Sequence, residues 1–244
     1  GATWTNVATG PSLTLTSETL VGRPLRVVAQ YTDGLGTPES IPSASQSVAN
    51  VNDAPAITSG GTATIAENQP ANTLVYQTVA TDPDAGTVLT YTLGGTDGAA
   101  FNVSSTGAVT FKAPADFETK ASYSFDVTAS DGTLSATKSG IVVTVTNAND
   151  LPTGAATIIG TVRQYETVTA SNTLVDQDGA GTLASATYQW QTSSDGTNWS
   201  DLVIGSSLVL TSETLVGKQL RVVAKYTDGQ GNNEAVASVP QTVV

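Results

Sequence analysis

The chain of 244 residues contains no cysteine, no methionine and no histidine. The missing cysteines exclude disulfides and thiolate nucleophiles, and zinc sites built from cysteine or histidine are excluded with them. A Ser-His-Asp triad is excluded as well, because its general base does not exist in this chain. These absences remove the common thiol and imidazole chemistries.

Basic residues are scarce: 9 Lys and Arg stand against 21 Asp and Glu, which makes the formal net charge −12 and the pI about 4.1. This balance argues strongly against nucleic-acid binding. No apolar run approaches about 18 residues and no segment keeps a helical period, so a transmembrane helix is not expected. A chain this acidic is either a well-solvated secreted protein or one whose carboxylates are neutralised by cations.

The residues that are abundant favour β-structure. The chain is 39% hydrophobic and only 12% charged, and it is rich in Thr, Val, Ser, Ala and Gly. This composition predicts strands joined by tight turns. The predicted fold class is all-β, with tandem antiparallel β-sandwich domains in an extended array. Cysteine-free, Thr- and Gly-rich β-structure is also a common composition of bacterial cell-surface proteins.

The chain repeats itself. Residues 1–49 align without a gap onto residues 196–244, with 27 of 49 positions identical, which indicates recent duplication. Two similar segments, Asn-Val-Asn-Asp-Ala-Pro at 50–55 and Asn-Ala-Asn-Asp-Leu-Pro at 147–152, lie 97 residues apart. Each ends one β-rich block and begins the next. The chain is therefore interpreted as a part of a longer array in which two types of domain alternate.

Residues 1–49 carry only about four expected strands, too few to close a sandwich. We expect them to pack poorly, or to borrow the missing strands from a neighbouring chain or a preceding segment. Residue 1 falls inside a repeat, so the absence of a signal peptide says nothing about export.

The two six-residue segments each place a carboxylate beside two carboxamides, before a stiffening proline. This arrangement suits a joint that holds a hard metal ion through oxygen ligands. The same residues also suit an ordinary polar linker between domains. Carboxylates aimed at the joints from elsewhere would distinguish the two interpretations.

Seven short alternating runs separated by Gly, Asn and Asp lie between the two segments, as in an antiparallel sandwich. The expected strands are 62–66, 73–79, 88–93, 99–103, 107–112, 121–130 and 137–146. Tyr91, Phe101, Phe111 and Phe117 are expected in its core.

Acidic residues occur in pairs within this block. Asp82 and Asp84 are two residues apart and point the same way on extended backbone, as do Asp116 and Glu118. Singly, such residues are also good turn formers. Acids gathered on one face indicate that a cation binds there.

In order and spacing, these elements resemble a cadherin repeat of the bacterial cadherin-like kind over residues 55–152. The cadherin pattern of an early Glu, Asp-x-Asp, Asp-x-Glu, Ala-x-Asp and acidic linker falls on Glu67, Asp82 and Asp84, Asp116 and Glu118, Asp131, and Asn149 and Asp150. The resemblance implies Ca²⁺ bound where one domain, the linker and the next domain meet. The linker departs from animal cadherins in having Asn147 in place of Asp and Leu151 before Pro152, so one to three ions per joint are expected.

The block from Tyr188 to Gly229 resembles the immunoglobulin-like repeats of large bacterial surface proteins, with Trp190 on an expected central strand. The expected organisation is half of an immunoglobulin-like repeat at 1–49, a linker at 50–55, a cadherin-like domain at 55–147, a linker at 147–152 and an immunoglobulin-like domain at 152–244.

The last domain repeats the acidic layout, since Asp176 and Asp178 match the earlier Asp-x-Asp and Asp228 matches Asp131. Glu213 falls level with Asp116, and Glu166 is a weaker counterpart of Glu67. The implied metal ligands of the second joint are Glu67, Asp116, Glu118, Asn149, Asp150, Asp176, Asp178 and Asp228. Those of the first joint are Glu18, Asn52, Asp53, Asp82, Asp84 and Asp131.

The function expected on this basis is that of a calcium-rigidified structural or extender segment of a repetitive extracellular bacterial adhesin or surface fibre. Its expected partners are calcium ions and neighbouring repeats, with self-association into fibres as an option and no membrane insertion in this segment. The alternative is a carbohydrate- or protein-binding module of a cell-surface or biofilm-matrix protein, with Trp4 and Trp199 as stacking candidates. Glycosidase chemistry by Asp116 and Glu118 is disfavoured by the placement of these residues at a joint, and no catalytic residues are expected.

Overall fold

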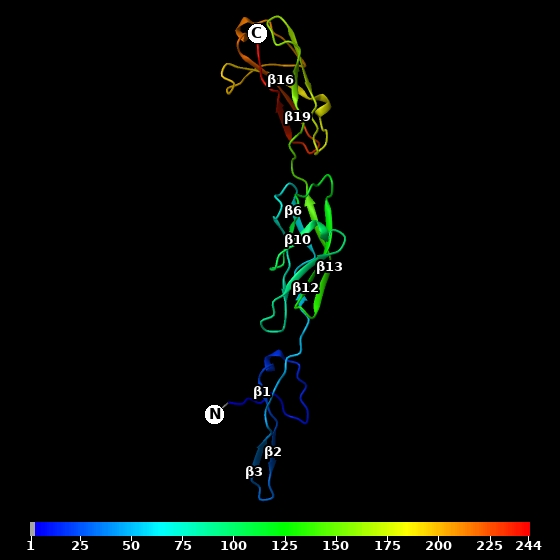
Figure 1. Ribbon diagram of the computed structural model, residues 1–244, viewed down its shortest axis with the longest axis vertical. Coiled ribbons are helices and arrows are strands. Elements are labelled where there is room, and N and C mark those ends of the chain that lie inside the picture. Colours follow the sequence, from blue (N-terminus) through cyan, green and yellow to red (C-terminus); the bar gives the residue numbers. More distant parts are fainter. Residues whose placement is uncertain (1–2) are drawn as a thin grey trace. The chain divides into compact units, whose positions relative to one another are not determined.

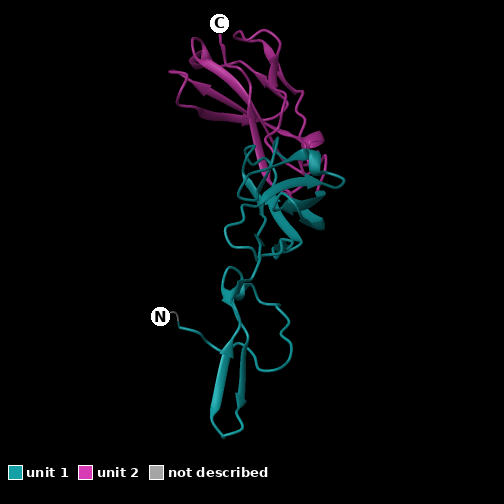
Figure 2. Ribbon diagram, turned by 60° about the horizontal axis from the view of Figure 1, so that its bottom comes forward, with its two compact units in different colours: residues 1–115, 122–145 teal, residues 116–121, 146–244 magenta. Residues whose placement is uncertain are grey.

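The computed structural model describes residues 3–244; residues 1–2, part of the expected 1–49 segment, lie outside the described residues. The described chain is built of β-strands and four short 3₁₀ helices and has no α-helix, which confirms the all-β class (Figure 1). It divides into two compact units (Figure 2). Unit 1 comprises residues 1–115 and 122–145, and unit 2 comprises residues 116–121 and 146–244.

Unit 1 contains two antiparallel sheets that correspond to the expected sandwich. The first has the strand order β6–β13–β12–β9, formed by Thr62–Ala66, Ser135–Thr146, Ser122–Ser130 and Thr90–Gly94. The second has the order β10–β11–β7, formed by Phe101–Val103, Ala108–Phe111 and Leu74–Gln77. A short ladder pairs β5 (Ala56–Ile57) with β8 (Ala80–Thr81), and η2 covers Gly98–Ala100. Each of the seven expected runs overlaps a strand.

The core of unit 1 follows the period of two along its strands. Phe125, Val127 and Ala129 of β12 are all fully buried, while the residues between them are half-buried. The rings of Phe101 and Phe111 lie 4.4 Å apart and stack. Burial of these two rings confirms their prediction as core, whereas Tyr91 and Phe117 are only half-buried.

The N-terminal part of unit 1 is built differently. It holds η1 (Glu18–Leu20) and two separate ladders, β1 (Pro24–Leu25) with β4 (Gln46–Ser47) and β2 (Val28–Thr32) with β3 (Pro38–Pro42). No side chain among residues 3–49 is buried. This agrees with the poor packing expected of a segment with so few strands.

Unit 2 also contains two antiparallel sheets. The larger has the order β17–β16–β19–β20, formed by Ser200–Ile204, Thr187–Ser193, Gln219–Thr227 and Asn233–Ala237, with β21 (Gln241–Thr242) also on β19. The smaller has the order β14–β15–β18, formed by Ala156–Ile159, Thr167–Asn172 and Ser207–Val209. Short helices η3 (Leu183–Ser185) and η4 (Glu213–Leu215) lie in the connections. β16 is an internal strand, as predicted.

The core of unit 2 is organised around Trp190 of β16, which is completely buried. Its indole Nε1 donates a hydrogen bond to the carbonyl of Gly205 at 2.9 Å, so the polar atom of the ring is satisfied. The surrounding apolar residues come from both halves of the unit: Val162 and Val168 from the first half, and Leu210, Leu215, Leu220, Val222 and Val243 from the second.

Candidate metal centre

The first acidic cluster lies in unit 1, where the loop after β8 meets the 50–55 segment. The backbone N–H of Asp84 donates to the Asp82 carboxylate at 2.8 Å, which closes the Asp-Pro-Asp turn. Two linker groups then bind Asp84: the N–H of Asp53 at 2.7 Å and the Nδ2 of Asn50 at 2.6 Å. The Asp-x-Asp motif is therefore held by the linker itself.

Glu18, Asp53 and Asp84 each offer a carboxylate oxygen, and these three atoms lie within 4.8 Å of one another. Desolvation, followed by the negative charges of Asp53 and Asp84, raises the pKa of Glu18 above its ordinary value. One Asp82 oxygen is shielded from solvent and has no hydrogen-bond partner among the described residues. A shielded acceptor without a donor, two residues from Asp84, fits a cation better than it fits a hydrogen-bonded turn.

Asp131 lies in the turn between β12 and β13. Its carboxylate accepts hydrogen bonds from the backbone N–H groups of Thr133 at 2.6 Å and Leu134 at 2.7 Å, and from Asn52 Nδ2 at 2.7 Å. These donors, the backbone groups first, lower the pKa of Asp131. The structure thus brings the predicted ligands Asn52 and Asp131 together.

The second acidic cluster lies within unit 2. Asp176, Asp178 and Asp228 are 8%, 8% and 4% exposed, and each offers an oxygen within 4.8 Å of the others. The N–H of Asp178 donates to Asp176 at 3.1 Å, and the N–H of linker Asp150 donates to Asp178 at 2.5 Å. In unit 1, the N–H of Asp84 likewise donates to Asp82, and Asp84 likewise accepts from the N–H of the linker residue Asp53.

Neighbouring polar groups orient these buried carboxylates. Burial alone would raise the pKa of Asp228, but hydrogen bonds from the side chain and backbone of Asn232 and from the N–H groups of Gln230 and Gly231 lower it. The Tyr226 hydroxyl donates to Asp176 at 2.5 Å. Burial, together with this bond and the Asp176 charge, raises the pKa of Tyr226, so its hydroxyl stays protonated.

The 147–152 linker adds further contacts within unit 2. Asn147 donates to Glu118 at 2.8 Å, and the side-chain amide of Gln230 donates to both Asn147 and Asp178. Asn149, a predicted ligand, donates to Glu234 at 3.0 Å.

Asp116, the aspartate of the Asp-x-Glu motif, also has its hydrogen-bond partners within unit 2. Asp116 accepts from Gln177 at 3.3 Å, and its pKa is lowered chiefly by the N–H of Thr119.

Several of these participants were missed in the sequence. Asn147 was interpreted only as a departure from the animal linker. Tyr226 and Glu234 recur as Tyr31 and Glu39, but each is also an ordinary strand residue. Nothing in the sequence distinguishes Gln230.

Glu67 directly follows β6 in unit 1 and is 1% exposed. Its predicted partners Asp116, Glu118 and Asp150 belong to unit 2, so its role as a shared ligand stays a prediction. Glu166, the weaker counterpart, instead pairs with Arg163 at 2.9 Å and is 46% exposed. An exposed ion pair of this kind is an ordinary surface contact.

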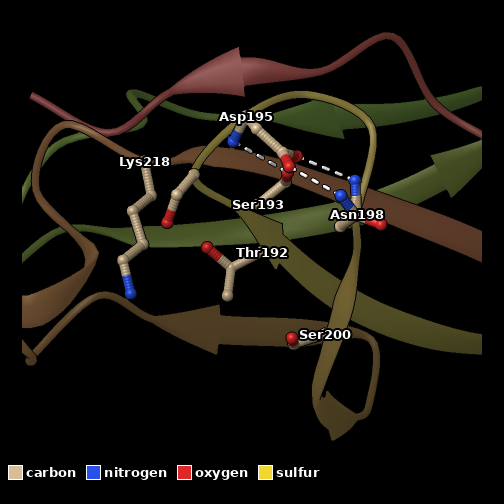
Figure 3. Close-up of a pocket in the computed structure, with 7 residues that line it drawn as sticks. Thr192, Ser193, Asp195, Asn198, Ser200 and Lys218 are labelled. Atoms are coloured by element: carbon tan, nitrogen blue, oxygen red, sulfur yellow. Dashed lines mark hydrogen bonds between the residues drawn. The ribbon is translucent and has the colours of Figure 1, made fainter.

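The aromatic residues proposed to stack on sugars have charged neighbours. Arg221 lies over the Trp199 ring and Arg26 over the Trp4 ring, each 4.0 Å from the ring centroid. A nearby cavity of about 250 Å³ is lined by Thr192, Ser193, Ser194, Asp195, Asn198, Ser200 and Lys218, with no aromatic residue among them (Figure 3). Its Asp195 closes the loop by accepting hydrogen bonds from Asn198, which lower the Asp195 pKa.

The donor set of both clusters is oxygen only: carboxylates and the amide carbonyls of Asn and Gln. Calcium takes 6–8 such oxygens with flexible geometry, whereas magnesium prefers a smaller octahedron with retained waters. The fold and the clusters therefore define a class of β-sandwich with acidic, linker-associated sites suited to calcium.

Comparison with known proteins agrees with this class. Residues 61–146, about a third of the chain, match the family model of the cadherin domain. The family match covers this segment alone. A comparison with curated proteins found no match.

The chain is also similar to solved cadherin structures. It is 21% identical to protocadherin gammaB7 EC3-6, with 93% of this chain and 59% of that chain covered and a TM-score of 0.48. Mouse cadherin-23 EC22-24 is 17% identical, covering 95% and 77% with a TM-score of 0.48, and human protocadherin-24 EC1-2 is 19% identical, covering 80% and 99% with a TM-score of 0.43. The chain thus spans 59% of the first of these structures. All three TM-scores are below 0.5, so the assignment of the cadherin domain depends on the family model.

Proposed function

We propose that the chain is a calcium-rigidified extender segment of a repetitive extracellular adhesin or surface fibre of a bacterium. The observation that carries this proposal is the repeated linker geometry. In both clusters, the N–H of the linker aspartate (Asp53 or Asp150) donates to the second carboxylate of an Asp-x-Asp motif (Asp84 or Asp178). A linker that only separated two domains would not need to bind acidic residues in the same way twice.

The charge of these clusters explains why a cation is needed. Two unit charges about 4 Å apart repel by roughly 1 kcal/mol in water and by roughly 4 kcal/mol at the effective dielectric of a protein surface. Asp176 and Asp178 are nearly buried, so bulk water screens them poorly. A calcium ion converts this repulsion into attraction and at the same time ties the linker to the domain that follows.

The proposed ligands are assigned to two joints. Asn52 and Asp131 are assigned to the first joint because the Asn52 side chain donates a hydrogen bond to Asp131. Gln230 is added to the second joint because it contacts Asn147 and Asp178. Glu67 is retained on the cadherin resemblance alone. The first joint comprises Glu18, Asn52, Asp53, Asp82, Asp84 and Asp131, and the second comprises Glu67, Asp116, Glu118, Asn149, Asp150, Asp176, Asp178 and Asp228, together with the added Gln230.

The role is mechanical and not catalytic. The cadherin domain is an extracellular adhesion fold and not an enzyme fold. Calcium at each joint would fix the angle between successive domains, so that domains joined by flexible linkers would form a stiff spacer. Among residues 3–244, no helix is long and apolar enough to cross a membrane. The composition favours a bacterial surface protein, and residues 1–49 and 196–244 favour a repetitive one.

Calorimetric titration of calcium into the chelator-treated chain tests the proposal. We expect at least two sites, with a Kd of roughly 10⁻⁴–10⁻³ M, the range of extracellular modules. Asp84→Asn and Asp178→Asn should each weaken one class of site by roughly tenfold or more, because each removes one charged ligand. Asp201→Asn is the matched control, since Asp201 lies on β17 and accepts from Gln191 outside both clusters. No heat of binding at millimolar calcium would refute the proposal.

A further inference from the structure

The duplicated halves of the chain differ sharply in burial. In unit 2, the second half of the repeat (196–244) contributes seven residues to the two buried core clusters: Leu210, Leu215, Leu220, Val222, Ala224, Tyr226 and Val243. All seven are identical at the matching positions of the first copy: Leu15, Leu20, Leu25, Val27, Ala29, Tyr31 and Val48. None of these seven is buried. Val222 is 0% exposed where Val27 is 72% exposed, and Tyr226 is 6% exposed where Tyr31 is 50% exposed.

The uncovered copy nevertheless has the local conformation of the covered one. Ser43 N–H donates to the Val27 carbonyl as Ser238 N–H donates to that of Val222, and each Ser hydroxyl accepts from the same Val N–H. The Val48–Arg23 backbone bond likewise matches the bond from Val243 to Lys218. The first copy therefore presents its apolar face already shaped for a partner.

The second copy shows what covers such a face. Residues 152–195 contribute Ala156, Val162, Val168, Leu174 and Trp190 to the two core clusters. The same segment provides β16, which pairs with β19 from Thr187↔Lys225 to Ser193↔Gln219. In the first copy, the matching residues 24–30 pair only with β3 and β4 among the described residues, so the edge that β16 would occupy is open (Figure 1).

We propose that the face of residues 3–49 docks a first-half repeat segment of the 152–195 type, added as a strand on this open edge with its tryptophan against Val27. The docked segment would supply two complementary features. Its strand would pair with the open strand edge, and its apolar side chains would cover the exposed apolar residues of the face. The seven apolar residues of this face include none of the proposed calcium ligands.

A labelled peptide with the sequence of residues 152–195, titrated into the full chain and followed by fluorescence anisotropy, tests the proposal. We expect saturable binding that Val27→Asp weakens by at least about tenfold, because the docked state would bury an unpaired charge. Val27 is exposed in the free chain, so this substitution leaves the folded parts intact. Val21→Asp is the matched control, because its counterpart Val216 remains 46% exposed in the covered copy.

A cysteine pair tests the register. The chain has no cysteine, so a Thr187→Cys peptide should form a disulfide with Gln30→Cys, which matches the Thr187↔Lys225 pair. Thr32→Cys, two positions along the same strand, should react at least about tenfold less. Absence of binding, equal binding to Val27→Asp, or equal reaction with both cysteines would overturn the proposal. Self-association of the chain that Val27→Asp abolishes would overturn it too, because the face would then pair with its own copy.

Discussion

The buried acidic cluster of unit 2 leads to a prediction in which one substitution stabilises the calcium-free chain and weakens its response to calcium. Asp176 is 8% exposed, and its carboxylate lies within 4.8 Å of that of Asp178. At this separation, two unit charges repel by about 0.9 kcal/mol in water and about 3.5 kcal/mol at an effective dielectric of 20. Asp176→Asn keeps the shape and removes the charge.

The substitution also has a cost, because the Tyr226 hydroxyl loses a charged acceptor at 2.5 Å. Replacing a charge-assisted hydrogen bond by a neutral one costs about 1 kcal/mol. In chelator, Asp176→Asn should therefore stabilise unit 2 by about 1–2 kcal/mol. At about 100 times its Kd, calcium stabilises the unsubstituted chain by about 2.7 kcal/mol, and a tenfold weaker site reduces this response to about 1.4 kcal/mol.

Urea denaturation in chelator and in excess calcium, followed by the fluorescence of buried Trp190, measures both effects. Asp201→Asn serves as the control and should change neither. The reasoning fails if Asp176→Asn destabilises the calcium-free chain, since its carboxylates would then be satisfied without a cation. An undiminished calcium response would show that Asp176 is not a ligand.

Three further predictions concern packing, acid stability and sugar binding. Val222→Ala should destabilise unit 2 by about 2 kcal/mol, whereas Val27→Ala should change stability by less than about 0.5 kcal/mol, as measured by thermal unfolding; equal effects would contradict the exposure difference. The pKa of Asp131 is lowered on folding, so its contribution to stability is present above its unfolded pKa of about 3.9 and is lost as the pH falls through its folded value. Acid titrations in chelator should show that Asp131→Asn is less stable than the unsubstituted chain at pH 6 and equally stable below about pH 3. The pKa of Glu18 is raised instead, so its contribution to stability is lost as the pH rises. Trp199→Ala should leave binding on a glycan array unchanged, because Arg221 lies over the ring; loss of a glycan signal would revive the binding-module alternative.

Much of the fold could be predicted because it depends on local alternation. The pattern along 121–130 places Phe125 and Val127 on one face, and both are buried in β12. Trp190 was expected on a central strand from the resemblance to immunoglobulin-like repeats, and it is completely buried in β16. Such residues need only a sheet face to bury, and any sandwich provides one.

The candidate sites were predictable as a set but not as contacts. Asp-x-Asp pairs and linker aspartates are visible in the sequence because their spacing is local. Contacts such as that of Asn52 with Asp131 or Gln230 with Asn147 join residues 79 and 83 positions apart through flexible carboxamides. Their partners are set by loop conformation, which no residue pattern specifies.

The different burial of the two duplicated segments could not be predicted from a residue pattern either. Val27 and Val222 share nearly the same sequence surroundings, yet one is 72% exposed and the other 0%. A local pattern identifies a side chain that is able to enter a core. Whether it does so depends on the strands that cover it.

Small-angle X-ray scattering of the chain in millimolar calcium and in chelator tests the central claim most directly. Calcium should give a larger maximum dimension and a narrower distribution of distances, because each joint is fixed when its carboxylates share an ion. The double variant Asp84→Asn with Asp178→Asn should give the chelator curve even in calcium. Superimposable curves for the unsubstituted chain in both conditions would contradict calcium rigidification.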